Sequence, residues 1–252
     1  MKRFARLFNE LDTSTSTRSK VDALKRYFAI AGAADAAWAV YFLAGGKPRQ
    51  AINSRLLRDF AIAASGLPEW LFEESYQAVG DMAETIALLL PPAVKQSDGS
   101  LAFWIEQRLL PLRGRAPNDV LAALTTYVDE LDTPERFLLI KLIGGGFRVG
   151  VSRLLVIRAL AEHSGIDAKL VAQRMIGYTD VSSAPTPKKY LSLIDAGDHV
   201  VADGHPYPFF LAHSLTLPVE RITEELGSPA TCLIEWKYDG IRAQLVCRAG
   251  KA

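Results

Sequence analysis

The sequence is poor in the residues that build disulfide frameworks, metal centres and membrane spans. Two cysteines in 252 residues are too few for a disulfide framework, and we interpret both as reduced thiols of a cytoplasmic protein. The four histidines follow no metal-ligand spacing, so no metal site is expected. No apolar run is long enough to cross a bilayer, and the first residues are amphipathic, unlike a signal peptide. We therefore expect a cytoplasmic monomer that does not enter a membrane.

The sequence also lacks an excess of charge of one sign. Its 29 basic and 28 acidic residues give a net charge of +1. A protein-wide basic signature for nucleic acid is thus absent, and any such site must be a local patch. Hydrophobic residues make up 49% of the chain, which excludes a disordered protein and is enough for a sizeable core.

Helical patterns fill the first 178 residues. Phe4, Leu7, Phe8 and Leu11 recur at the spacing i, i+3, i+4, i+7 of one helix face. Thr133-Pro134-Glu135 combines an N-cap, a proline at the first helical position and an acidic first turn. About ten such segments predict a mainly α fold, an all-helical orthogonal bundle.

The composition changes after residue 178. Residues 179–204 include Ser182-Ser183-Ala184-Pro185-Thr186-Pro187, which is rich in turn residues and is interpreted as a linker. Within it, Thr186-Pro187 is suited to cap a short helix through Ile194. Beyond it, Thr231–Ile234 and Ala243–Cys247 have the composition of strands. A surface loop within a single domain is the alternative for the Ser/Pro-rich stretch.

A faint repeat lies within the helical region. Phe42–Gly46 is followed by Ser54–Leu57, and Leu142–Gly146 by Ser152–Leu155, with the word Ser-Arg-Leu-Leu in both. A helix that ends at glycines exposes backbone N–H groups before the next helix begins, a geometry that binds anions. Glycine helix ends beside solvated basic faces are the alternative. The basic residues are Lys47, Arg49, Arg55 and Arg58 in the first copy and Arg148, Arg153 and Arg158 in the second.

Lys237 stands in the pattern Lys-x-Asp-Gly-x-Arg. A lysine amine is a good nucleophile only when it is deprotonated and held in place. A nearby arginine can lower the pKa of the lysine and hold a phosphate. Asp239-Gly240 predicts a tight turn that returns Arg242 to Lys237. These residues suit attack by the lysine on the α-phosphate of a nucleotide, and an ordinary surface hairpin is the alternative.

The pattern around Lys237 resembles the nucleotide-binding lysine motif of ATP-dependent DNA ligases, within the ligase and mRNA-capping nucleotidyltransferase superfamily. His205–Ala212 resembles the segment that precedes this lysine, with Phe210 where Met is usual. Gly146–Val151 resembles the turn with which the family's helical N-terminal domain, built of two halves related by approximate two-fold symmetry, approaches DNA. The Tyr-Pro-Phe-Phe-Leu-Ala form of residues 207–212 is most similar to that of bacterial ATP-dependent ligases.

The resemblance implies an all-helical DNA-binding domain over 1–178, a linker over 179–204 and the truncated start of an adenylation domain over 205–252. Lys237 would be adenylated by ATP, with Glu235 near the adenine, Arg242 on the AMP and Mg²⁺ neutralising the developing charge. AMP would pass to the 5′-phosphate of nicked duplex DNA, and the 3′-hydroxyl would seal the nick, as in DNA replication, repair or recombination. The implied DNA-binding residues are Gly146, Arg148, Gly150, Arg153, Arg158, Lys47, Arg49 and Arg55.

Three other functions stay open. An RNA ligase or capping nucleotidyltransferase shares the lysine motif, but its family lacks so large a helical N-terminal region. An NAD-dependent ligase would bring a different N-terminal domain and later zinc-binding cysteines. A non-catalytic DNA-binding module is the third. The ligase family places further nucleotide-binding motifs downstream, so we expect a fragment that does not complete ligation alone.

Overall fold

The computed structural model describes residues 1–48, 51–144, 147, 149–182, 184–197, 214–232, 236, 240, 243 and 245–247. The chain divides into two compact units, Met1–Gly197 and Asp198–Ala252. The described residues are mainly helical and contain no strand, so the mainly α fold class is confirmed.

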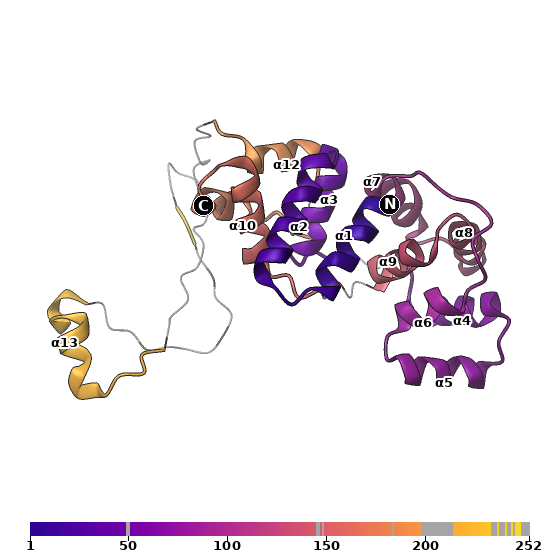
Figure 1. Cartoon of the computed structure of the whole chain (residues 1–252), viewed down its shortest axis with the longest axis horizontal. Coiled ribbons are helices and arrows are strands. Elements are labelled where there is room, and N and C mark those ends of the chain that lie inside the picture. Colours follow the sequence, from indigo (N-terminus) through magenta and orange to yellow (C-terminus); the bar gives the residue numbers. More distant parts are fainter. Residues whose placement is uncertain are drawn as a thin grey trace. The chain divides into compact units, whose positions relative to one another are not determined.

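The first unit holds all the long helices (Figure 1). It begins with α1 (Lys2–Thr13), α2 (Thr17–Ile30) and α3 (Ala33–Leu43), followed by α4 (Ser54–Ser65), α5 (Glu69–Val79) and α6 (Met82–Leu89). The short α7 (Leu101–Phe103) continues as the π-helical η1 (Trp104–Leu109) and the 3-10 turn η2 (Leu110–Leu112). Then come α8 (Pro117–Asp129), α9 (Thr133–Gly144), α10 (Arg153–Ser164), α11 (Ala168–Arg174) and α12 (Pro187–Ile194).

Local sequence signals explain many of the helix boundaries. The predicted stripe of α1 is buried, with Leu11 fully inaccessible. Several helices begin at a side chain that accepts a hydrogen bond from a backbone N–H group of the first turn, which satisfies an otherwise unpaired donor. The capping residues include Ser16, Asn53, Asp81, Ser100, Ser152, Asp167 and Thr186.

The helices of the first unit pack in matching pairs. α10 packs on α2, and α4 packs on α8; α12 packs on α3, and α6 packs on α9. A further matching pair of contacts completes the pattern: α1 packs on α9, and its counterpart α7 packs on α3. Helices α1 to α5 begin at Lys2, Thr17, Ala33, Ser54 and Glu69, and their counterparts α7 to α11 begin at Leu101, Pro117, Thr133, Arg153 and Ala168, about 100 residues later in each case. The contacts are those of a duplicated helical unit whose copies have exchanged their last three helices.

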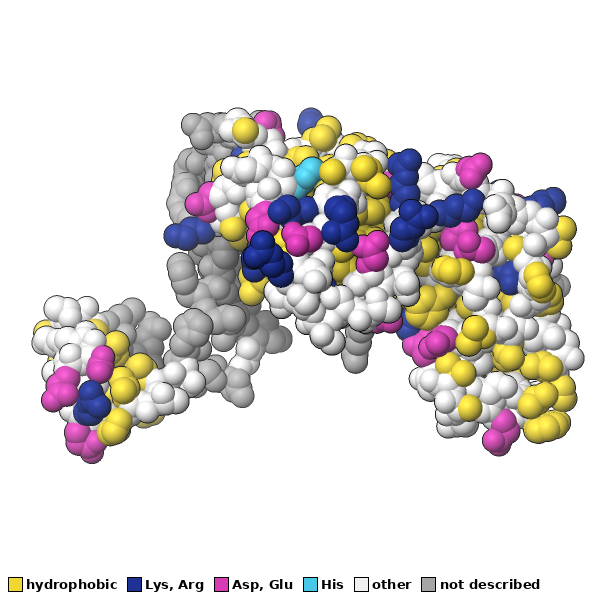
Figure 2. All heavy atoms as spheres, in the orientation of Figure 1, with side chains coloured by type: hydrophobic (Ala, Val, Ile, Leu, Met, Phe, Trp, Pro, Cys, Tyr) yellow, Lys and Arg dark blue, Asp and Glu magenta, His cyan; other side chains and the backbone are white. Residues whose placement is uncertain are grey.

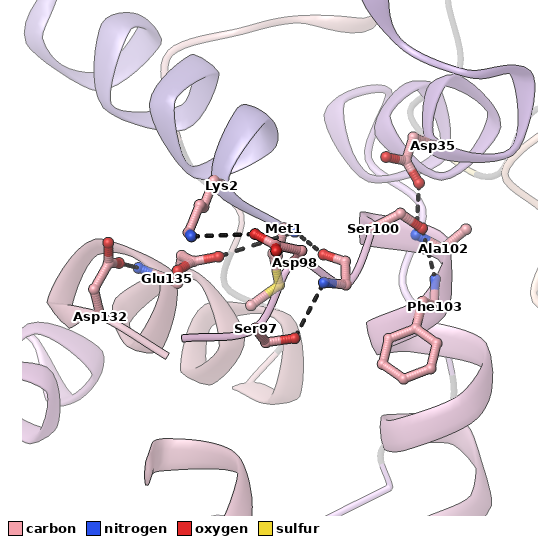
Figure 3. Close-up of polar contacts among 11 residues, drawn as sticks. Met1, Lys2, Asp35, Ser97, Asp98, Ser100, Ala102, Phe103, Asp132 and Glu135 are labelled. Carbon is pink, nitrogen blue, oxygen red and sulfur yellow. Dashed lines mark hydrogen bonds and ion pairs between the residues drawn. The ribbon is translucent and has the colours of Figure 1, made fainter. Parts of the chain in front are cut away.

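Two carboxylates occupy matching places in this arrangement (Figure 3). Asp35, in the first turn of α3, accepts a hydrogen bond from the N–H of Ala102 at 2.9 Å, at the beginning of α7. Glu135, in the first turn of α9, lies 3.9 Å from the amine of Met1, at the beginning of α1. An acidic group is favourable at a helix N-terminus because the backbone dipoles leave positive charge there.

Residues 187–194 form the short helix expected after Thr186-Pro187, but they belong to the first unit rather than to a linker over 179–204. They form α12, in which Tyr190 and Leu193 are buried in the core of the first unit. This compact unit therefore ends at Gly197, whereas the sequence placed the boundary at 178. The turn-rich composition before Thr186 reflects the approach to a helix N-cap rather than the end of the domain.

The second unit is described over short segments only. It contains η3 (Val219–Arg221), α13 (Ile222–Leu226) and η4 (Pro229–Thr231). The strand predicted from Thr231 is not seen there, because Thr231 ends η4 and Cys232 follows as a bend; Leu245–Cys247 have no regular structure either. A strand needs partners for its backbone hydrogen bonds, and the described residues of this unit supply none.

The position of α12 predicts that a fragment ending at residue 178 is less stable than one ending at residue 197. The shorter fragment lacks Tyr190 and Leu193 and exposes the face of α3 that they cover. Burial of a large apolar side chain contributes about 1.5–3 kcal/mol, so we expect a loss of roughly 3 kcal/mol or more. Urea unfolding of the two fragments measures this difference. Equal stability would contradict the assignment of α12 to the core.

Glu135 predicts a pH-dependent stability. Burial, with a smaller effect of Asp132, raises the pKa of Glu135 from its ordinary value of 4.5 to about 7. Between these values the folded carboxyl keeps a proton that the unfolded one loses, so stability falls as the pH rises through this window. Glu135→Gln should therefore stabilise the protein more at about pH 8 than at about pH 5, by roughly 1–3 kcal/mol. Urea unfolding at both pH values tests this, with the exposed Glu84→Gln as control.

Candidate nucleic-acid interface

Two connections carry the chain between the exchanged copies. The first follows α3 and leads to α4, and the second follows α9 and leads to α10. They meet where the ring of Phe42, in the last turn of α3, stacks on the ring of Phe147 in the second connection, with centroids 5.6 Å apart. The cavity left beside them, lined by Phe42, Pro48, Leu142 and Ile143 among others, has a volume of only about 20 Å³. The two connections are therefore closely packed where they begin.

Glycines shape the first connection. Gly45 has a φ of 95°, in the region that favours glycine. The N–H of Gly46 donates to the carbonyl of Tyr41 at 2.8 Å, and a Cβ at Gly46 would lie 2.6 Å from that oxygen. No residue larger than glycine fits at position 46 in this tight turn. Lys47 follows and is exposed, and the side chain of Asn53 then caps α4 by accepting from the N–H of Leu56 at 2.7 Å.

The second connection is held by alternate residues. Phe147 packs against Phe4 and Phe8 of α1, with ring centroids 5.7 and 4.9 Å away, and Val149 is buried. Gly150 is exposed and has a φ of 60°. Ser152 then caps α10 by accepting from a backbone N–H in the first turn. The inner side of this connection is apolar and fixed, and its outer side faces solvent at Gly150.

A buried lysine lies beneath the second connection. Lys20 of α2 is 7% exposed, and its Nζ donates to the carbonyls of Val149 at 2.7 Å and Gly150 at 3.2 Å. Lys20 was not among the site residues predicted from the sequence. A signal was present, since Lys20 lies four and seven residues before Leu24 and Tyr27, on the buried stripe of α2.

The predicted basic residues differ in solvent exposure and in whether their side chains have partners within the protein. On the first connection, Lys47 is exposed, and the side chain of Arg55 is 93% exposed with only Asp59 nearby, at 3.9 Å. The guanidinium of Arg153 donates to the carbonyl of Met175 at the end of α11, and burial lowers the pKa of Arg153. Arg158 is paired with Glu162 at 2.8 Å. Lys47 and Arg55 therefore face solvent, whereas Arg153 and Arg158 have partners within the protein.

Several predicted site residues lie outside the described residues. They are Arg49, Gly146 and Arg148 of the two connections, and Glu235, Lys237 and Arg242 of the nucleotide motif. Their roles stay predictions from the sequence.

The word Ser-Arg-Leu-Leu is out of register with the structural repeat. The helix caps are Asn53 and Ser152, so the serine precedes α10 but lies inside α4. When the caps are aligned, Arg153 corresponds to Ser54, and the buried positions agree in pairs: Leu57 with Val156, Phe60 with Ala159, and Ala61 with Leu160. Arg55 and Arg153 are therefore not counterparts, which corrects the alignment made from the sequence.

Basic side chains also gather on the face formed by α1, α2 and α10, where acidic side chains lie among them (Figure 2). Lys25 and Arg158 both contact Glu162, and Arg26 pairs with Glu10 at 2.9 Å. These pairs neutralise part of the positive charge of this face. Figure 2 thus shows a mixed surface there rather than a uniformly positive one.

In the described part of the chain, no helix is long and apolar enough to cross a membrane. Within the same residues, no three His, Cys, Asp or Glu side chains cluster in a way that would hold a metal ion.

Comparison with known proteins agrees with this architecture. Residues 1–161 match the family described as the DNA ligase N terminus. The chain is 27% identical over 183 residues to a probable DNA ligase of Koribacter versatilis, covering 71% of this chain and 30% of that protein. It is 28% identical over 199 residues to a DNA ligase of Pyrobaculum arsenaticum, covering 72% of this chain and 32% of that protein. The chain thus spans about a third of the length of these relatives.

The family match covers more than half of the chain and includes both connections. It confirms the resemblance to DNA ligases that the sequence motifs predicted. The chain belongs to the family of DNA ligase N-terminal regions.

Proposed function

We propose that this chain is the N-terminal part of an ATP-dependent DNA ligase, and that its first unit holds nicked duplex DNA during sealing. The observation that carries the proposal is the meeting of the two connections at the stacked rings of Phe42 and Phe147, between two copies of one helical unit. Each connection runs from a glycine-containing turn to the N-terminus of a twelve-residue helix.

The symmetry of this arrangement suits a duplex. The two strands of DNA are related by two-fold axes perpendicular to the helix axis, so a protein with two similar turns about such an axis presents one turn to each sugar–phosphate backbone. Backbone N–H groups and basic side chains at helix N-termini suit phosphate oxygens. Contacts of this kind carry no sequence information, as sealing a nick at any sequence requires.

The charge distribution supports binding at the connections. The net charge of the chain is +1, so a local patch must supply the attraction. Lys47 and Arg55 are open to solvent on the first connection, whereas Arg158 and Lys25 on the mixed face are already paired with Glu162. On the first connection, basic groups therefore remain available for phosphates.

The nucleotide half of the proposal rests on the sequence. Lys237 is proposed as the nucleophile for ATP, with Glu235 and Arg242 binding the nucleotide and Mg²⁺ as the metal cofactor. The two relatives are named as a probable DNA ligase and a DNA ligase, which supports ligase chemistry in general. The proposal places adenylation in a region that begins within 205–252.

Charge reversal on the second connection tests DNA binding. Arg148→Glu should weaken binding to nicked duplex by an order of magnitude or more, uniformly across sequences. Each lost phosphate contact should also reduce the slope of log affinity against log salt by about 1. Fluorescence anisotropy with labelled duplexes of different sequence measures both effects.

Two further variants refine this test. Arg55→Glu should weaken binding more than Arg153→Glu, because the side chain of Arg55 is 93% exposed and, among the described residues, pairs only with Asp59 at 3.9 Å, whereas Arg153 donates to the carbonyl of Met175. Arg26→Glu, on the mixed face, serves as the control. Unchanged affinity in both the Arg148 and Arg55 variants would remove DNA binding from the connections.

Lys237→Ala tests the nucleotide chemistry. The full-length protein should become covalently labelled by ATP that carries a radiolabel on the α-phosphate, because attack by the lysine forms a bond to that phosphorus and releases unlabelled pyrophosphate. Lys237→Ala should abolish the label, whereas Lys251→Ala, in the same region, should keep it. Label retained in the Lys237 variant would refute the assignment, and DNA binding without any label in the wild type would indicate a non-catalytic module.

A further inference from the structure

The ammonium group of Lys20 has an unusual set of partners. It is buried, yet it contacts two successive backbone carbonyls, those of Val149 and Gly150, at 2.7 and 3.2 Å. Among the described residues it forms no ion pair with a carboxylate. A buried charge without a counter-charge is costly, so its retention calls for a compensating interaction.

The two hydrogen bonds fix how the second connection faces solvent. In a planar trans peptide the C=O and the following N–H point in opposite directions. When the carbonyls of Val149 and Gly150 face Lys20, the N–H groups of Gly150 and Val151 face away from it. The left-handed conformation of Gly150, with a φ of 60°, allows both carbonyls to point to the same side, which an extended chain does not allow.

The outward N–H groups have no partner within the described protein. Neither Gly150 nor Val151 donates a backbone hydrogen bond to any described residue. Two adjacent, unpaired N–H groups with a positive charge behind them form a favourable place for an anion. A single phosphate placed there would supply both the counter-charge that Lys20 lacks and the acceptors that these N–H groups lack.

The first connection has no such lysine. In the paired helices, α8 corresponds to α2, and the residue in the place of Lys20 is Val120, which is buried. The apolar packing is shared by the two copies, and the buried ammonium belongs to one of them alone. This difference separates Lys20 from the common architecture of the repeat.

We propose that Lys20 is a positioning residue for DNA binding: it holds the second connection so that the N–H groups of Gly150 and Val151 face a phosphate of the DNA backbone. This inference rests on the proposed DNA-binding function. Lys20 itself touches no DNA in this arrangement, since its Nζ lies behind the two peptide groups.

A double-mutant cycle on the 252-residue chain tests the proposal. The variants are Lys20→Met, which removes the anchor, and Gly150→Ala, whose Cβ would lie 2.6 Å from the Nζ of Lys20 on a backbone that disfavours side chains. Lys25→Met is the control, because Lys25 is on the same helix but is partly exposed and paired with Glu162. Thermal unfolding is measured for each variant, and affinity for nicked duplex DNA by anisotropy at several salt concentrations.

Both single variants are expected to weaken DNA binding on the order of tenfold and to lower the salt slope by about 1, because the phosphate contact of the connection is lost. The double variant should bind DNA no more weakly than the weaker-binding of the two single variants, because both changes remove the same interaction. Lys25→Met should change neither quantity by a comparable amount. A merely structural role for Lys20 would lower the melting temperature without this shared effect on the salt slope.

The outcomes separate the inference from the proposed function. If the wild type does not bind DNA, both fail. If the wild type binds and Arg148→Glu weakens binding, but Lys20→Met binds like Lys25→Met, only the role of Lys20 is refuted. Additive losses in the double variant would also refute it. If Lys20→Met does not fold, Gly150→Ala decides: a folded variant with wild-type affinity and salt slope refutes the role, and a weakened one with a lower slope supports it.

Discussion

The stacking of Phe42 on Phe147 holds the chain at the point where it crosses twice between the copies of the helical unit, and both copies depend on it. The same ring of Phe147 also contacts Phe4 and Phe8, so α1, α3 and the second connection share one aromatic cluster. Each aromatic pair adds about 0.5–1.5 kcal/mol beyond the area that it buries. Loss of Phe147 would therefore loosen the exchanged helices and the solvent-facing side of the connection together.

The apolar framework is duplicated, but the buried charges are not. Lys20 has Val120 as its counterpart, and the buried Arg136, which donates to the carbonyls of Val128 and Pro91, stands where α3 has Ala36. Only the acidic residues at the starts of α3 and α9, Asp35 and Glu135, agree in sign. Packing requires shape alone, and the two copies can share it. Charged groups need specific partners, and the partners differ between the two connections.

The sequence predicted those features that local chemistry determines. The proline and acidic first turn after Thr133 correctly located α9, although the capping side chain is Asp132, one residue before the predicted cap, which accepts from the N–H of Glu135. The apolar stripe correctly located α1. Sequence reasoning located the short helix from Thr186-Pro187 to Ile194 but assigned it to a linker, because the burial of Tyr190 and Leu193 depends on contact with α3, more than a hundred residues earlier. The sequence revealed the repeat, but the shared word Ser-Arg-Leu-Leu aligned the two copies one residue away from the alignment given by the helix caps Asn53 and Ser152. The partner of Arg153, the carbonyl of Met175, has no signal in the sequence, and the nucleotide motif around Lys237 stays a prediction.

The exchange of helices also determines the order in which this protein can fold during synthesis. α2 and α3 leave the ribosome early, but the helices that cover them, α10 and α12, are encoded near the other end of the unit. At about 5–20 residues per second, the apolar faces of α2 and α3 remain uncovered for on the order of ten seconds. During that time α4 to α6 likewise wait for α8 and α9, so neither copy can mature before the other. Translation must pass α12 before the DNA ligase N-terminal region has a complete core, and until then the nascent chain exposes apolar surface of the kind that favours aggregation.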